Sequence, residues 1–420
     1  MFVNLTIPGH IDAGKSTTMG RLLLDLGSVD SRTVEKFEQE AAAMGKQSFA
    51  LAWVLDSFEE ERARGVTIDV AMKHFKTTQT LFTLLDAPGH QDFVPNMIAG
   101  AARADFGIVL IDANTGAFEK GLKGQTNEHI LLLRSFGVQR IIIAANKLDM
   151  VGWSQERFDE ISGQLGGYLG KIGFKLENIE FVPISGLHGD NVVKRSADAA
   201  AGWYNGPTLM EALESAASST TTAAVMTGVS KPFRLPVAET YKSDNGEWLV
   251  SGRISNGSVQ IGDKFLVQPS GTAVLVHSIK VHGTEPREWA VAGENVEISF
   301  GTGTNASVLE NVAAGDVVCP ADAAVQASTQ FLLRGLAFEH LLPMPLEVHR
   351  GRLKADAQIE SMPALLDKAT GVVVKKRPKM MAPGAYGLIK FVTTVPVVLE
   401  SGQRVVLRAE GKTVAAGVLE

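Results

Sequence analysis

The feature that most constrains this chain is the stretch Gly9-His10-Ile11-Asp12-Ala13-Gly14-Lys15-Ser16-Thr17 near its start. It fits the pattern of a glycine, four residues and then Gly-Lys-Ser/Thr. A short apolar segment at 2–7 precedes it, and apolar residues at helical spacing follow it. A glycine-rich turn between a strand and a helix directs backbone N–H groups and the positive end of a helix dipole at one point, where an anion binds. The sequence therefore predicts a phosphate-binding loop.

Two side chains of this loop have separate predicted roles. Lys15 would reach the β- and γ-phosphates of a nucleotide, and the Ser16 hydroxyl would be a ligand of Mg²⁺. The other residues expected around the phosphates on this pattern are Gly9, His10, Ala13, Gly14 and Thr17.

The length and composition limit the class of protein. At 420 residues the chain is too long for one core, so two or three domains are expected. Cys319 is the only cysteine, which excludes an internal disulfide and a cysteine-built metal site and favours a reducing, cytoplasmic compartment. The net charge of −6 gives no overall field for nucleic acid, so we expect no DNA partner and any RNA contact through local patches. Neither a signal peptide nor an apolar run of about 18 residues is found, so no membrane association is expected.

The first half alternates strand-like and helix-like segments. Apolar runs predict buried parallel strands at 106–111, 140–145 and 179–184, with shorter strands at 2–7, 74–77 and 81–86. Helical patterns are found near 92–102, 125–136 and 154–172, and a longer helical insertion is expected at about 31–64, with Asp56 and Glu59 as an N-cap pair. This alternation predicts an α/β domain with a mostly parallel, doubly wound sheet over residues 1–222.

The second half has a different rhythm. An Ala/Ser/Thr-rich stretch at 216–231 predicts a linker. Short alternating strands with turn signals follow, and the segment at 248–254, the turn Asn256-Gly257 and the pair Val259 and Ile261 predict a hairpin. We expect two antiparallel β-barrels, at 223–325 and 326–420.

Asp86-Ala87-Pro88-Gly89-His90 follows an apolar strand, which places Asp86 at the carboxyl end of a strand, where open α/β sheets bind ligands. A carboxylate there can hold Mg²⁺ directly or through water. Gly89 can give its N–H to a γ-phosphate without steric hindrance. The segment therefore predicts a second part of a phosphate and metal site.

Asn146-Lys147-Leu148-Asp149 ends another strand. The carboxylate of Asp149 accepts hydrogen bonds only, so it matches the two donors of guanine, N1–H and the exocyclic amine. Adenine has no such pair, and hydrogen bonds to a charged group are worth roughly 1.5–3 kcal/mol each. The residues Ser185, Gly186 and Leu187, after the last strand, would present backbone N–H groups to the guanine oxygen. We therefore expect a guanine nucleotide, GTP or GDP.

The motifs GHIDAGKST, RGVTID, DAPGH and NKLD, together with SGL, resemble those of the translational GTPases, and the resemblance extends over the whole chain. The segments at 30–37 and 48–56 are similar to the branch that holds elongation factor 1-alpha and the eukaryotic release-factor GTPase. Within this branch, the segments at 49–53 and 86–98 look most like the ribosome-rescue GTPases that partner Pelota, the HBS-one-like proteins.

This resemblance implies further roles. His90 matches the catalytic histidine that orients the attacking water, and Ile11 and Val66 match an apolar gate in front of it. Thr67 matches a threonine that completes the Mg²⁺ shell beside Ser16 and Asp86 and senses the γ-phosphate, and Asp12 matches a residue near the phosphates. The sequence shows no identifiable arginine finger, which elsewhere is worth on the order of 10³–10⁵ in rate. Slow hydrolysis by the isolated protein, stimulated by ribosomes with a partner, is therefore expected.

The function implied is that of a monomeric GTPase that delivers a tRNA-shaped protein, Pelota, to the A site of stalled ribosomes. The alternatives are delivery of a class-I release factor, delivery of aminoacyl-tRNA, a non-hydrolysing scaffold between ribosome and exosome, and a metabolic GTPase that ignores ribosomes. The densest basic run, Lys375-Lys376-Arg377-Pro378-Lys379, is either a contact to ribosomal RNA or a partner, or a solvated barrel loop.

Overall fold

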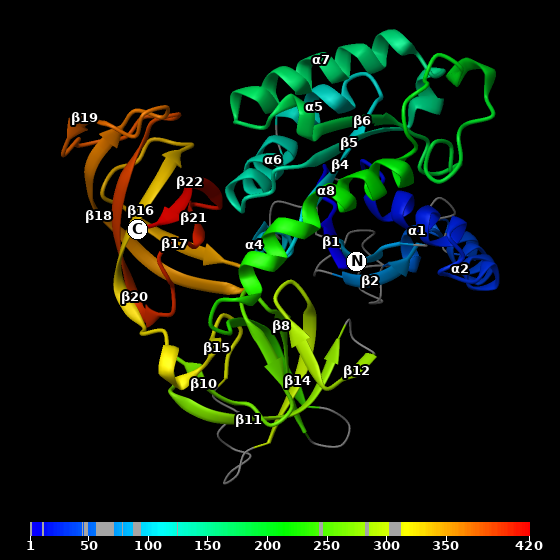
Figure 1. Ribbon diagram of the computed structural model, residues 1–420. Helices are drawn as coiled ribbons and strands as arrows, with labels where there is room; N and C mark the ends of the chain where they lie inside the picture. The colour runs from blue at the N-terminus through cyan, green and yellow to red at the C-terminus, as the bar shows by residue number, and fades with distance from the viewer. Residues whose placement is uncertain are drawn as a thin grey trace. The chain divides into compact units, whose positions relative to one another are not determined.

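The computed structural model of the protein describes residues 2–10, 12–43, 45, 49–55, 71–77, 79–86, 94–123, 125–242, 247–281, 285–301 and 312–420 (Figure 1). It divides into two compact units, Met1–Thr221 and Thr222–Glu420. The first has an α/β core, and the second has the cores of two barrels. The expected fold class, an α/β domain followed by two antiparallel β-barrels, is confirmed.

The first unit is built on a six-stranded sheet with the order β2-β3-β1-β4-β5-β6. All neighbouring strands are parallel except β2, which runs antiparallel to β3. The central strands are buried along nearly their whole length because parallel sheets have both faces covered. The strands are β1 (Phe2–Thr6), β2 (Ala71–Lys76), β3 (Leu81–Asp86), β4 (Phe106–Asp112), β5 (Ile141–Asn146) and β6 (Ile179–Pro183).

The helices of this unit bury their apolar stripes against the sheet. Met19 and Leu22 on one helix and Leu213 on another are fully buried in one cluster with Leu5 and Ile108 of the strands. These helices are α1 (Lys15–Asp25), α2 (Ser31–Ala43), α4 (Val94–Ala101), α5 (Ala117–Lys123), α6 (Gln125–Ser135), α7 (Gln155–Lys171) and α8 (Leu209–Val229). α5 has no counterpart among the predicted helices.

The insertion expected to be helical over 31–64 is not one continuous helix. Helix α2 ends at Ala43, and among the described residues 49–55 there is a 3₁₀ turn at Ala52–Val54; residues 56–64 lie outside the described ranges. The chain turns back because Trp53, 2% exposed, packs edge-on against Phe37 of α2 at a centroid distance of 6.4 Å. The expected N-cap pair Asp56 and Glu59 lies outside the described residues.

The linker expected at 216–231 is also wrong, because α8 continues through most of it. Alanine is the best helix former, and serine hydroxyls can be satisfied inside a helix. Ser218 Oγ donates to Ser215 O and Ser219 Oγ donates to Ala216 O, both at 2.9 Å. Since Ala216 and Ala217 are themselves buried, the helix needs no stripe of large apolar residues there.

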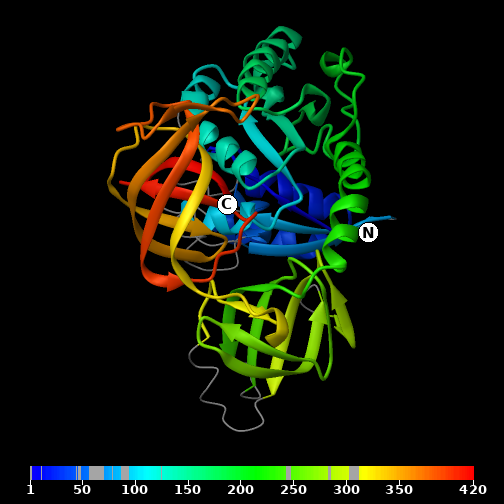
Figure 2. The ribbon, with the colours of Figure 1, turned by 60° about the vertical axis from the view of Figure 1, so that its left-hand side comes forward.

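The second unit contains two antiparallel barrels (Figure 2). In the described residues each ring has six strands, and it is closed by the pair β10–β11 in the first barrel and β17–β18 in the second. The first ring is β10 (Lys264–Gln268), β15 (Val317–Cys319), β7 (Leu235–Lys242), β8 (Trp248–Arg253), β14 (Asn295–Gly301) and β11 (Thr272–Val281), with β12 (Glu285–Arg287) added to β11. The second is β17 (Pro345–Arg350), β21 (Arg404–Ala409), β22 (Lys412–Leu419), β16 (Ser328–Ala337), β20 (Tyr386–Val397) and β18 (Leu353–Leu366), with β19 (Val373–Lys376) added to β18.

The hairpin expected around Asn256-Gly257 does not form. Strand β8 pairs with β7 and β14, whereas β9 (Ser258–Gln260) pairs with β13 (Trp289–Val291) in a separate two-stranded sheet. The turn needs glycine at position 257, because its φ is 76° and a Cβ there would come within 2.5 Å of the Phe233 Cα.

Polar and apolar contacts join the two barrels into one unit. Arg234 Nε donates to both carboxylate oxygens of Glu400 at 3.0 and 3.1 Å, and its Nη2 donates to Ala323 O at 2.8 Å. Val317, Val325 and Val398 form a small shared cluster. Among the described helices of the whole chain, none is both long and apolar enough to cross a membrane.

Candidate functional site

The predicted phosphate loop lies between β1 and α1, at the carboxyl edge of the parallel sheet. Gly14 has a φ of 86°, in the left-handed region, and a Cβ there would come within 2.5 Å of the Asn146 amide nitrogen. Glycine is required at this position by both its conformation and its close neighbour. Helix α1 begins at the next residue, so its N-terminal N–H groups open toward the loop.

Lys15 is nearly buried inside this loop, at 8% exposure. Its Nζ donates to Gly9 O at 3.1 Å and to His10 O at 3.0 Å, so the loop's own carbonyls hold the ammonium in place. Burial lowers the pKa of Lys15, and the nearby carboxylates of Asp86 and Asp12 oppose that shift. An ammonium held among carbonyl groups at a helix N-terminus is suited to an incoming phosphate.

Ser16 and Asp86 lie together although they are 70 positions apart. Ser16 Oγ donates to Asp86 Oδ2 at 3.1 Å, and Asp86 is fully buried at the end of β3. A hydroxyl and a carboxylate are the hard oxygen donors that suit Mg²⁺, which takes few protein ligands and completes its shell with phosphates and water. These two residues therefore fit the predicted metal site. Thr67, the third expected ligand, lies outside the described residues.

Asn146, at the end of β5, connects the phosphate loop to the segment 185–187, the predicted base loop. Its Nδ2 donates to Ala13 O at 2.8 Å and more weakly to Thr18 Oγ1 at 3.4 Å. Its Oδ1 accepts from the backbone N–H groups of Lys147 and Gly186, both at 2.8 Å. With 3% exposure, the amide is a buried crosslink between three segments of the chain.

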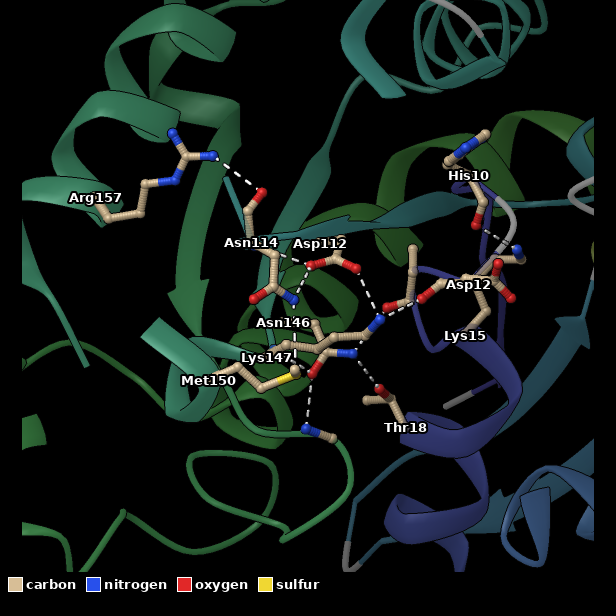
Figure 3. Close-up of polar contacts among 12 residues, drawn as sticks. His10, Asp12, Lys15, Thr18, Asp112, Asn114, Asn146, Lys147, Met150 and Arg157 are labelled. Atoms are coloured by element: carbon tan, nitrogen blue, oxygen red, sulfur yellow. Dashed lines mark hydrogen bonds and ion pairs between the residues drawn. The ribbon is translucent and has the colours of Figure 1, made fainter. Parts of the chain in front are cut away.

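Lys147 makes a second link, drawn in Figure 3. Its Nζ donates to Asp12 O at 2.6 Å and to Asp112 Oδ2 at 2.7 Å. The other oxygen of Asp112 accepts from the backbone and side-chain nitrogens of Asn114, at 2.9 and 2.7 Å. Asp112 and Asn114 belong to none of the predicted motifs. The position of Asp112 could have predicted its role, because it ends β4 at the same edge of the sheet as Asp86 and Asn146.

Asp149 and the segment 185–189 form the other end of this edge. Ser185 N donates to Asp190 O at 3.1 Å and Gly189 N donates to Ser185 O at 2.8 Å, which closes the loop on itself. Arg21 of α1 pins its tip, because its Nη2 donates to Leu187 O at 2.6 Å. The Asp149 carboxylate is partly exposed, and His188 Nε2 lies 3.7 Å from its Oδ2. A carboxylate is thus available where a base is expected.

His129 of α6 was also missed by sequence analysis. It is fully buried, and neither ring nitrogen has a hydrogen-bond partner in the described part of the chain. Burial lowers the pKa of His129 to about 3, and the nearby positive charges of Lys15 and His10 act in the same direction. The imidazole is therefore neutral behind the phosphate loop.

The described residues bring together most of the predicted site. The phosphate-loop residues, Asp86, the Asn146–Asp149 segment and the Ser185–Leu187 segment share one edge of one sheet. Five predicted residues lie outside the described ranges, so the structure describes nothing of their placement: Ile11, Val66, Thr67, Gly89 and His90. The basic run at 375–379 belongs to the second unit, on and after β19, and most of it is exposed.

Two protein families match the chain. The Elongation factor Tu GTP binding domain matches residues 1–219, and the GTP-eEF1A C-terminal domain-like family matches residues 344–420. The first of these covers the unit that contains the candidate site, and the second covers most of the last barrel.

Individual relatives match over nearly the whole chain. Protein HBS1 of Drosophila melanogaster is 38% identical over 99% of this chain, which spans 62% of the relative's length. Elongation factor 1-alpha of Ignicoccus hospitalis is 36% identical over 99% of this chain and 95% of its own. Among solved structures, the Saccharomyces cerevisiae Ski7 GTPase-like domain, bound to GDP and inorganic phosphate, has the same fold, with a TM-score of 0.82 at 17% identity over 100% of this chain and 97% of that one.

Proposed function

Because the chain belongs to the translational GTPases with an elongation factor Tu-type GTP-binding domain, we propose that it delivers a tRNA-shaped, Pelota-like protein to the A site of stalled ribosomes. The expectation of family and of GTPase activity is confirmed by these matches. Delivery of a Pelota-like protein is supported by the similarity to Protein HBS1 along almost the entire chain. This chain spans 62% of that relative's length.

The candidate site supports a guanine nucleotide switch. Lys15 would bind the β- and γ-phosphates, and Asp149 would accept from the N1–H and the amine of guanine. Ser16 and Asp86, with Thr67, would hold Mg²⁺, which neutralises phosphate charge when bound. Asn146 and Lys147 connect the phosphate end of the site to the base end through Ala13 O, Asp12 O and Gly186 N. One nucleotide would therefore be held by segments that already constrain each other.

Hydrolysis would act as the timer. We assign His90 the orientation of the attacking water, and the Thr67 segment the reading of the γ-phosphate. Loss of the γ-phosphate removes the contacts that order such a segment, so the partner is released after hydrolysis. The remaining nucleotide contacts we propose involve Gly9, His10, Asp12, Ala13, Gly14, Thr17, Gly89, Lys147, Ser185, Gly186 and Leu187. The place of action would be the cytoplasm, on the ribosome.

Delivery of aminoacyl-tRNA is the second candidate. Elongation factor 1-alpha is almost as similar to this chain, and the chain covers nearly all of that relative's length. The two functions use the same switch and differ in what the barrels carry.

Capture experiments separate these functions. The full chain is immobilised with GTP, a non-hydrolysable GTP analogue or GDP, and offered a purified Pelota-like protein, a class-I release factor or aminoacyl-tRNA. The proposal expects capture of the Pelota-like protein with the triphosphate and not with GDP, and hydrolysis that rises strongly only with ribosomes and that partner. Capture of aminoacyl-tRNA alone would assign elongation, and capture of the release factor alone would assign termination.

The Asp149→Asn variant provides the matched control. If Asp149 reads the base, partner capture by this variant should respond to xanthosine triphosphate in place of GTP. Nucleotide-independent capture would show that the partner does not read the switch.

A further inference from the structure

We propose that His188 is a positioning residue for base recognition, which holds the Asp149 carboxylate in the orientation that guanine requires. This inference rests on the proposed nucleotide site and adds a residue to it. His188 directly follows Leu187, the last residue of the predicted base-binding segment 185–187.

The geometry places the two side chains as a pair. His188 Nε2 lies 3.7 Å from Asp149 Oδ2, a close polar contact that is longer than a hydrogen bond. The two residues come from different segments, His188 from the 185–189 loop and Asp149 from the 3₁₀ turn Leu148–Val151 after β5. Their contact therefore depends on how these segments are held, not on local chain geometry.

The position of His188 is well determined by its surroundings. Gly186 N donates to Asn146 Oδ1, Arg21 donates to Leu187 O, and Gly189 N donates to Ser185 O. Residues on both sides of His188 are thus bound, while its side chain is 61% exposed. An exposed imidazole on an anchored loop can face the carboxylate without a strained backbone.

Guanine and His188 can use the carboxylate at the same time. A carboxylate has about four lone-pair sites on its two oxygens, and the N1–H and amine of guanine occupy one on each. An imidazole beside a remaining site favours one orientation of the carboxylate before the base arrives, which reduces the ordering cost of binding. The imidazole therefore favours the bound nucleotide and does not compete with it.

The experiment measures release of fluorescent GDP from the full chain by stopped flow, for the wild type, His188→Ala and His188→Gln. Because a contact between an exposed imidazole and a carboxylate contributes little, His188→Ala should release GDP roughly two- to fivefold faster. Gln keeps a polar N–H group that can face the Asp149 carboxylate, so His188→Gln should release GDP at a rate close to that of the wild type. Equal rates for Ala and wild type, or equal rates for Ala and Gln, would overturn the proposal.

The chain contains a matched control pair. His277 Nδ1 lies 3.8 Å from Glu247 Oε1, with His277 66% exposed, in the first barrel of the second unit. His277→Ala removes a similar contact between an imidazole and a carboxylate outside the candidate site and should leave the release rate unchanged. A similar acceleration in both variants would overturn the role of His188.

The Asp149→Asn background separates this inference from the proposed site. With fluorescent xanthosine diphosphate on that background, His188→Ala should have no effect, because the carboxylate on which His188 acts is gone. An equal effect in both backgrounds would mean that His188 acts on the loop and not through Asp149. If Asp149→Asn itself leaves the guanine preference unchanged, the proposed base site fails, whatever His188 does.

Discussion

Replacement of Asn146 by alanine tests whether the two ends of the nucleotide site are mechanically connected. The amide of Asn146 joins Ala13 of the phosphate loop to Gly186 in the 185–187 segment. Alanine removes these bonds and leaves a buried carbonyl at Ala13 and a buried N–H at Gly186 without this partner. Both loops should then move independently.

The magnitude follows from the bonds lost. Three hydrogen bonds of 2.8 Å disappear, to Ala13 O and from Lys147 N and Gly186 N, in surroundings where Asn146 is 3% exposed. At roughly 0.5–1.5 kcal/mol net for each, the free energy of unfolding of the first unit should fall by about 3 kcal/mol. Amide hydrogen exchange in β1, β4 and β5 measures this loss separately from the barrels.

Asn191→Ala is the matched control for stability. Asn191 is 4% exposed in the same unit, and its side chain makes two bonds, Nδ2 to Pro183 O at 3.0 Å and Oδ1 from Ser196 N at 2.9 Å. It should reduce stability without disconnecting the phosphate loop. We expect GDP affinity, measured by calorimetry, to fall at least about tenfold more in Asn146→Ala than in Asn191→Ala, an amount equal to about 1.4 kcal/mol. Equal affinities in the two variants would refute the connection between the loops.

Three further predictions concern single residues. Because burial lowers the pKa of His129 to about 3, from about 6.5 in the unfolded chain, the unfolded state binds a proton that the folded state does not, and stability falls as the pH drops below about 6.5. The loss at about pH 5 should be about 2 kcal/mol relative to neutral pH, and urea unfolding of His129→Leu should lack this part of the pH dependence. Asp149→Asn should favour xanthosine over guanosine nucleotides in competition binding, and an unchanged preference would remove Asp149 from the base site. His90→Ala should keep GTP affinity while ribosome-stimulated hydrolysis is lost, whereas a fall in affinity would make His90 structural.

The sequence by itself determined the features that depend on neighbours along the chain. The glycine pattern at 9–16 predicts a phosphate loop because φ > 0 at Gly14 and an amide-lined turn are local properties. Alternation of apolar residues predicts the barrel strands, and continuous apolar runs predict β4 and β5, because burial on one or both faces follows directly from side-chain period. Even Asp112 was accessible to the rule that ligand-binding residues lie at the carboxyl ends of parallel strands.

The tertiary structure alone decided which distant segments meet. Helix α8 continues past residue 215, where Ala216 and Ala217 pack into a core that composition does not reveal, and β9 pairs with β13 instead of forming a hairpin with β8. The contacts of Asn146 with Ala13 and Gly186, and of His188 with Asp149, join segments that have no common pattern. Local patterns set backbone conformation and strand ends, whereas hydrogen bonds and packing between remote segments exist only once the sheet has brought those ends to one edge.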